Sequence, residues 1–80
     1  MPRVRLFAGA REAAGRASDE LPGDTVGEVL AAARERYGEA FAAVLERSRV
    51  WVNGEPAGAD DPVAGSDEVA VLPPVSGGTP

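Results

Sequence analysis

The segment from Thr25 to Gly38 constrains the fold most, because it carries the clearest helical pattern in the chain. Its apolar residues recur at helical spacing and form a single stripe: Val26, Val29, Leu30, Ala33 and Tyr37. Thr25 and Glu28 fit a capping box, in which a hydroxyl and a carboxylate each accept a hydrogen bond from a backbone N–H near the helix start. Gly38 supplies the stop. A chain of 80 residues forms one small core, so this stripe must be covered within a single domain.

Short strand patterns precede the helix. Residues 3–8 alternate, which points Val4, Leu6 and Ala8 toward the core and leaves Arg3, Arg5 and Phe7 outside. Residues 9–15 then form a connector with a helical turn over 10–14. A second, weaker strand is predicted over residues 16–21.

The second half of the chain adds a short helix and two further strands. Residues 40–46 predict a helical stretch that buries Phe41, Val44 and Leu45. In the strand at 49–52, alternation points Val50 and Val52 inward and Arg49 and Trp51 outward. Asn53-Gly54 is a strong tight-turn signal, and residues 55–66 predict loops and short edge segments. A final strand at 68–72 ends at Pro73-Pro74, because proline cannot donate to the ladder.

This order of elements predicts an α+β fold, in which a small mixed sheet packs on one main helix. We expect one domain over residues 1–74 and a flexible C-terminal tail over residues 75–80.

The composition excludes several classes of function. The chain has no cysteine and no histidine, so it offers no thiolate, no imidazole base and no sulfur-rich metal site. Its 13 acidic residues are scattered, and the pairs at 60–61 and 67–68 lack a calcium-loop pattern, so we expect no metal and no catalysis. The net charge of −5 argues against nucleic-acid binding. Without a long apolar run we expect no membrane span and a cytoplasmic location.

The last residues carry a Gly-Gly pair. Gly77 and Gly78 have no Cβ, so they form a thin thread that can enter a narrow channel. Thr79 and Pro80 follow, so the carbonyl of Gly78 belongs to an amide and not to a free carboxylate.

Four blocks of sequence resemble one family, the small subunit of molybdopterin synthase with its relative the thiamine sulfur carrier, which have the ubiquitin-like β-grasp fold. The blocks are VRLFAGARE at residues 4–12, TVGEVL at 25–30, RVWVNGE at 49–55 and DEVAVLPPVSGG at 67–78. The last block is the most specific, and the resemblance spans nearly the whole chain.

The resemblance implies a sulfur carrier that is not itself an enzyme and binds no cofactor. An adenylating and sulfurtransferase activating enzyme would use ATP to adenylate the carboxylate of Gly78, and sulfur would then replace the adenylate to leave a thiocarboxylate. Gly77, which has no side chain, would let this end of the chain fit into the narrow active-site channel of the enzyme. The tail would next enter the large subunit of molybdopterin synthase and donate sulfur to a pterin precursor. Members of the family usually end at the second glycine, so a protease is expected to trim Thr79-Pro80.

Other functions remain open from the sequence. The carrier chemistry also serves thiamine, cysteine, thiolated tRNA or sulfur-containing natural products. A ubiquitin-like modifier would be joined through Gly78 to lysines of other proteins. A third alternative is a binding module with an inert tail.

Six residues are predicted to bind the partner proteins. Phe7, Trp51 and Leu72 point outward on three strands and would form an apolar patch, and exposed apolar patches often mark interaction sites. The base of the tail would add Pro74, Val75 and Ser76.

Overall fold

The computed structural model describes residues 1–74 and contains five strands and three helices within that range. Their bounds are β1 (Arg3–Leu6), α1 (Ala8–Ala14), β2 (Ser18–Glu20), α2 (Val26–Tyr37), α3 (Glu39–Glu46), β3 (Arg49–Val52), β4 (Glu55–Pro56) and β5 (Glu68–Leu72). The order agrees with the sequence prediction except in the connector between the first two strands, where the single helical turn expected over residues 10–14 is the seven-residue helix α1. The predicted tail at 75–80 lies outside the described residues.

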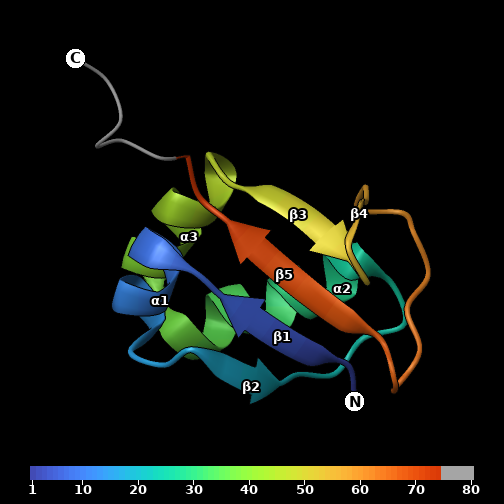
Figure 1. Cartoon of the computed structure of the whole chain (residues 1–80). Coiled ribbons are helices and arrows are strands. Elements are labelled where there is room, and N and C mark those ends of the chain that lie inside the picture. Colours follow the sequence, from blue (N-terminus) through green and yellow to red (C-terminus); the bar gives the residue numbers. More distant parts are fainter. Residues whose placement is uncertain (75–80) are drawn as a thin grey trace.

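The strands form one mixed sheet in the order β2-β1-β5-β3-β4 (Figure 1). The central strands β1 and β5 are parallel, and Val4 is in register with Val69. The other neighbouring strands are antiparallel, and β3 pairs with β5 so that Val50 lies opposite Val71. The first and last strands of the described chain therefore lie side by side in the middle of the sheet.

One face of the sheet packs on the helices, and the core fills the space between them (Figure 1). Every second residue of β1 and β5 points into this core from the sheet, and Val4, Val69 and Val71 are fully buried there. The whole buried apolar set is Val4, Leu6, Ala10, Leu21, Val26, Val29, Leu30, Ala33, Phe41, Leu45, Val63, Val69 and Val71. The predicted apolar stripe of α2 thus faces the sheet, and Val50 and Val52 are partly buried against the same core.

The start of α2 has the predicted cap in a shifted form. The Glu28 N–H donates to the Thr25 Oγ1 at 3.2 Å, as a capping box requires. The Glu28 carboxylate, however, accepts from the N–H of Asp24 at 2.8 Å, one residue before the cap. The carboxylate therefore stabilises the turn that leads into the helix.

A loop supplies the remaining partners at this helix end. The N–H of Val26 donates to the carbonyl of Asp61 at 2.9 Å, and the N–H of Gly27 donates to that of Ala59 at 2.8 Å. Gly23 sits directly beside this region with φ +153°, and a Cβ there would lie 2.6 Å from the backbone nitrogen of Val29. The entry to α2 therefore requires glycine at position 23.

The sequence prediction was wrong at the end of β1. Ala8 was expected to face the core, but β1 ends at Leu6 and Ala8 is an exposed residue that begins α1. Its φ of 49° turns the chain out of the strand, which breaks the alternation on which the prediction rested. Val44, predicted to be buried, is only partly so.

Within residues 1–74, none of the helices has the length and apolar character needed to span a membrane.

Candidate functional site

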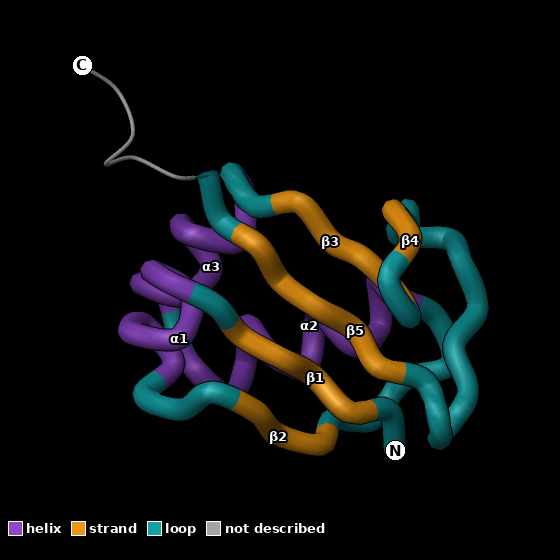
Figure 2. Tube along the Cα trace, viewed as in Figure 1, coloured by secondary structure: helices purple, strands orange, loops and turns teal. Residues whose placement is uncertain are grey.

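The candidate site lies on the face of the sheet that the helices leave uncovered (Figure 2). Strand register sorts the side chains of this face into rows that run across the sheet. Because neighbouring strands are paired residue by residue, each row joins outward side chains of adjacent strands, or of a residue that directly follows a strand.

The first row lies where β5 runs out toward the tail. The N–H of Phe7 donates to the carbonyl of Val71 at 3.3 Å, which places Phe7 beside the end of β5. Leu72 is paired in turn with Arg49 of β3. The Phe7 residue is 37% exposed, although it is large and apolar. An apolar strip bordered by a guanidinium therefore lies at the origin of the tail.

The second row adds an aromatic side chain. Trp51 pairs with Ala70 on one side and with Pro56 of β4 on the other. Arg5 pairs with Ala70 from β1, and its guanidinium carbon lies 5.5 Å from the centroid of the Phe7 ring, in the range of a cation–π contact. Since Ala70 has a small side chain and Trp51 a large one, the surface of this row is recessed at Ala70 and protrudes at Trp51.

The third row carries the acidic side chains. Glu68 and Glu20 each pair with Arg3, from β5 and β2 respectively. The Oε2 of Glu68 also lies 3.6 Å from the Nη1 of Arg5. Negative charge on the strands of this face is thus confined to the row farthest from the tail.

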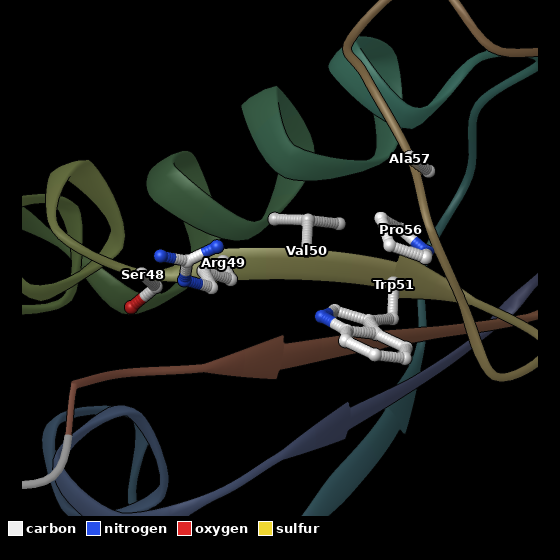
Figure 3. A pocket seen from close by; sticks show the side chains of 6 residues that line it. All are labelled: Ser48, Arg49, Val50, Trp51, Pro56 and Ala57. Carbon is white, nitrogen blue, oxygen red and sulfur yellow. The ribbon is translucent and has the colours of Figure 1, made fainter.

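Two hollows flank Trp51. The first lies at the base of the tail and is lined by Arg47, Arg49, Trp51, Leu72, Pro73 and Pro74. The second lies toward β4 and is lined by Ser48, Arg49, Val50, Trp51, Pro56 and Ala57 (Figure 3). In Figure 3 the side chain of Val50 points toward the helices, whereas the indole of Trp51 lies on the other side of β3. The predicted phase of this strand is therefore confirmed.

We use the name tail-base surface for Phe7, Arg47, Arg49, Trp51, Leu72, Pro73 and Pro74. The structure brings together four of the residues predicted to bind partners, namely Phe7, Trp51, Leu72 and Pro74.

The predicted site residues Val75, Ser76, Gly77 and Gly78 lie outside the described residues. Sequence reasoning did not include Arg47, Arg49 and Pro73 in the site. The outward phase of Arg49, which it shares with Trp51, was the available signal.

A separate polar cluster joins β2 to the end of α2. The Tyr37 hydroxyl donates to Oδ2 of Asp19 at 2.6 Å, and the Arg36 Nε and Arg16 Nη1 lie 2.9 and 3.2 Å from the same oxygen. The hydrogen bond from Tyr37, with help from the backbone and the two guanidinium groups, lowers the pKa of Asp19 against the opposing effect of burial. Burial, followed by the bond to Asp19, raises the pKa of Tyr37 to about 12.

A second polar cluster locks the turn after β3. Asn53 has φ 51°, and its Nδ2 donates to Oδ1 of Asp67 at 2.9 Å. Its Oδ1 accepts from the N–H of Glu68 at 3.0 Å. The N–H of Ala64 donates to Asp67 Oδ2, and this bond, ahead of the one from Asn53, lowers the pKa of Asp67. Both clusters are explained by the fold, and neither contributes to the tail-base surface.

No group of three or more metal-ligating side chains occurs within residues 1–74. The tail-base surface itself consists of apolar and cationic groups, which can contact another protein but supply no general base or nucleophile.

Comparisons with known proteins identify the family and the fold of the chain. The model of the ThiS family matches residues 4–78. The crystal structure of SAMP1 from Haloferax volcanii is 34% identical, with a TM-score of 0.79 over 95% of this chain and 97% of that chain. A search of the curated proteins found no match.

Two further solved structures are similar to the chain. The BexX/CysO complex from Amycolatopsis orientalis contains a chain 26% identical, with a TM-score of 0.82 over 98% of this chain and 100% of that one. A putative molybdopterin converting factor, subunit 1, from Pyrococcus furiosus is 27% identical, with a TM-score of 0.77 over 91% and 95%. The predicted ubiquitin-like β-grasp fold is confirmed.

Proposed function

Because the chain belongs to the ThiS family, we propose that it is a sulfur carrier that works through a thiocarboxylate on Gly78. The observation that carries the proposal is the extent of the family match, which runs through Gly77 and ends at Gly78. Thr79 and Pro80 lie beyond the match, and a protease removes them to free the carboxylate.

The chemistry is supplied by partners, and the chain serves as their substrate. A carboxylate is a poor electrophile, so the activating enzyme transfers AMP from ATP to Gly78 and releases pyrophosphate. Sulfur from a donor then replaces AMP, which leaves a thiocarboxylate. Such chemistry needs no histidine or cysteine in the carrier, and this chain has neither.

We propose that the sulfur carried on Gly78 is used in molybdopterin synthesis. The carrier inserts its tail into the large subunit of molybdopterin synthase and donates sulfur to a pterin precursor. The block DEVAVLPPVSGG supports this branch, as does the similarity to the molybdopterin converting factor from Pyrococcus furiosus. The tail-base surface serves as the contact for both partners, because Phe7, Trp51 and Leu72 surround the point where the tail leaves the sheet.

Two observations favour other uses of the same chemistry. The chain of the BexX/CysO complex is about as similar to this chain as the molybdopterin converting factor is, so a carrier for another pathway is the first alternative. The similarity to SAMP1, a small archaeal modifier protein, favours attachment of Gly78 to lysines of target proteins. The chain contains no lysine, so its own side chains could not receive such a bond.

The intact mass of the untagged protein, purified from its own cells without reducing agent, tests the proposal. A species that ends at Gly78 with one oxygen replaced by sulfur supports the carrier. Isopeptide-linked conjugates without that species support the modifier. If every species recovered from these cells still ends at Pro80, both the carrier and the modifier are contradicted, and a binding module is left.

Deletion of the gene distinguishes the pathways. If the carrier serves molybdopterin synthesis, molybdenum-dependent enzyme activity is lost and the unsulfurated pterin precursor accumulates. Normal molybdoenzyme activity in the deletion strain would contradict this destination while leaving the carrier chemistry intact.

A further inference from the structure

The charge of the tail-base surface is opposite to that of the protein. The chain has 13 acidic and 8 basic residues, for a net charge of −5. Nevertheless, the hollow at the base of the tail contains two arginines and no carboxylate among its lining residues. On the strands of the same face, Glu20 and Glu68 occur only in the row farthest from the tail.

Three other arginines have a role within the fold. Arg5 pairs with Glu68, and Arg16 and Arg36 pair with Asp19. In the described part of the chain, no carboxylate lies within 4.0 Å of the guanidinium of Arg47 or Arg49. Arg3, Arg11 and Arg34 also have no such partner within residues 1–74, but Arg47 and Arg49 are the two that line the hollow at the base of the tail. Their charges are available there to another molecule.

The fold accounts for Arg47 but not for Arg49. Arg47 is the C-cap of α3, where a positive charge is favourable beside the last carbonyls of a helix. Arg49 sits in β3 opposite Leu72 and two residues before Trp51, with its side chain exposed on the outer face. A guanidinium bordered by apolar side chains is the usual composition of a binding surface, where arginine and tryptophan are enriched.

We propose that Arg49, supported by Arg47, binds a carboxylate of the activating enzyme beside the entrance to its tail channel. The inference rests on the proposed function and names the chemistry that this partner must present. A guanidinium offers a planar pair of donors that matches a carboxylate, which fixes orientation as well as distance. Trp51, Pro73 and Pro74 line the same hollow, so apolar side chains lie beside the ion pair.

The contact also orients the approach of the carrier. If carboxylates surround the entrance to the tail channel, the enzyme repels most of the surface of a protein of net charge −5. It attracts the locally positive region around Arg47 and Arg49. Because that region surrounds the origin of the tail, the favoured encounter brings the tail to the channel first.

The test measures the affinity of the chain processed to Gly78 for its activating enzyme by calorimetry, in the absence and presence of an ATP analogue that cannot be cleaved between its α- and β-phosphates. Arg49→Glu should weaken binding about tenfold or more at low ionic strength. Arg34→Glu is the matched control, since Arg34 is an exposed arginine of α2 and the net charge changes equally. It should leave the affinity within about twofold of the unmodified protein.

Two further measurements sharpen the test. The difference between Arg49→Glu and the unmodified chain should shrink at about 0.5 M salt, because screening weakens exposed ion pairs. Arg49→Lys keeps the charge but loses the paired donors, so its affinity should lie between the two. Circular dichroism on each variant checks that the fold is retained.

The outcomes separate this inference from the proposed function. Equal affinity of Arg49→Glu and the unmodified chain, or equal weakening by Arg34→Glu, overturns the role of Arg49 and leaves the carrier function standing. If Arg49→Glu weakens binding only when the ATP analogue is bound, the anion that Arg49 contacts is a phosphate of the nucleotide, which also overturns the proposed carboxylate contact. If the unmodified chain neither binds the enzyme nor supports ATP–pyrophosphate exchange, both proposals fail.

Discussion

Tyr37 donates a 2.6 Å hydrogen bond to Oδ2 of Asp19, and this bond ties the end of α2 to the edge strand β2. The two residues lie 18 positions apart in the sequence. β2 has only three residues and pairs with β1 alone. The cluster around Asp19 is therefore a principal attachment of this strand to the helical layer.

Tyr37→Phe should lower the free energy of unfolding by about 1–2 kcal/mol, because Asp19 would lose its shortest hydrogen bond while remaining mostly buried. Urea denaturation followed by circular dichroism measures the change. The aromatic packing of residue 37 on Phe41, with ring centroids 5.1 Å apart, is retained in the variant. An unchanged midpoint would mean that the two arginines alone hold Asp19.

The same pair predicts how stability depends on pH. The pKa of Asp19 in the folded protein is below its usual 3.8, so its contribution is present above pH 3.8 and is lost as the pH falls through the lower value. The pKa of Tyr37 is raised from 10.0 to about 12, so its contribution is present below pH 10 and is lost as the pH rises toward 12. Tyr37→Phe should flatten both limbs of the stability curve; a curve that keeps its shape would contradict the assignment.

Gly23→Ala should destabilise the protein by about 2 kcal/mol or more, because the backbone at φ +153° disfavours a side chain and the new Cβ would lie 2.6 Å from the nitrogen of Val29. Gly58→Ala is the control, since a Cβ at that position meets nothing within 4 Å. Thermal unfolding of the two variants provides the comparison. Equal melting temperatures would show that the turn before α2 adjusts without cost.

Phe7→Ala and Trp51→Ala should each weaken binding to the activating enzyme about tenfold, because aromatic side chains commonly dominate interfaces. Melting temperatures should change little, since both side chains lie on the outer face of the sheet. Tyr37→Phe alters an aromatic residue on the helical side and should keep full affinity. Calorimetric titration with the activating enzyme measures the affinity of each variant. Undiminished binding by both alanine variants would exclude the tail-base surface as the contact.

Much of the fold could be predicted from the sequence because the strongest patterns are local. The stripe of α2, the alternation of Val4 with Leu6 and the Asn53-Gly54 turn each depend on residues close together in the chain. Alternation also placed Trp51 and Leu72 on the outer face. It failed at Ala8, because a single residue with positive φ ends the strand and begins a helix.

The polar clusters were harder to predict, because they depend on contacts between distant segments. Asp19 shares a strand face with the buried Leu21, which hinted that its carboxylate points inward. Nothing in the sequence identified Tyr37 and Arg36 as its partners. The tail-base surface was predicted in its apolar part only, because the significance of Arg49 depends on which arginines the fold has already neutralised.

The parallel pairing of β1 with β5 has a consequence for how the nascent chain folds. Among the strands of residues 1–74, β5 alone joins β2 and β1 to β3 and β4, and it follows all of them in the sequence. A nascent chain without it has two separate strand pairs and no continuous sheet, and contacts between such distant segments form slowly. The same strand carries Leu72 and leads directly into the tail. A chain that still lacks β5 therefore has no tail-base surface, and this surface forms in the same step that makes the sheet continuous.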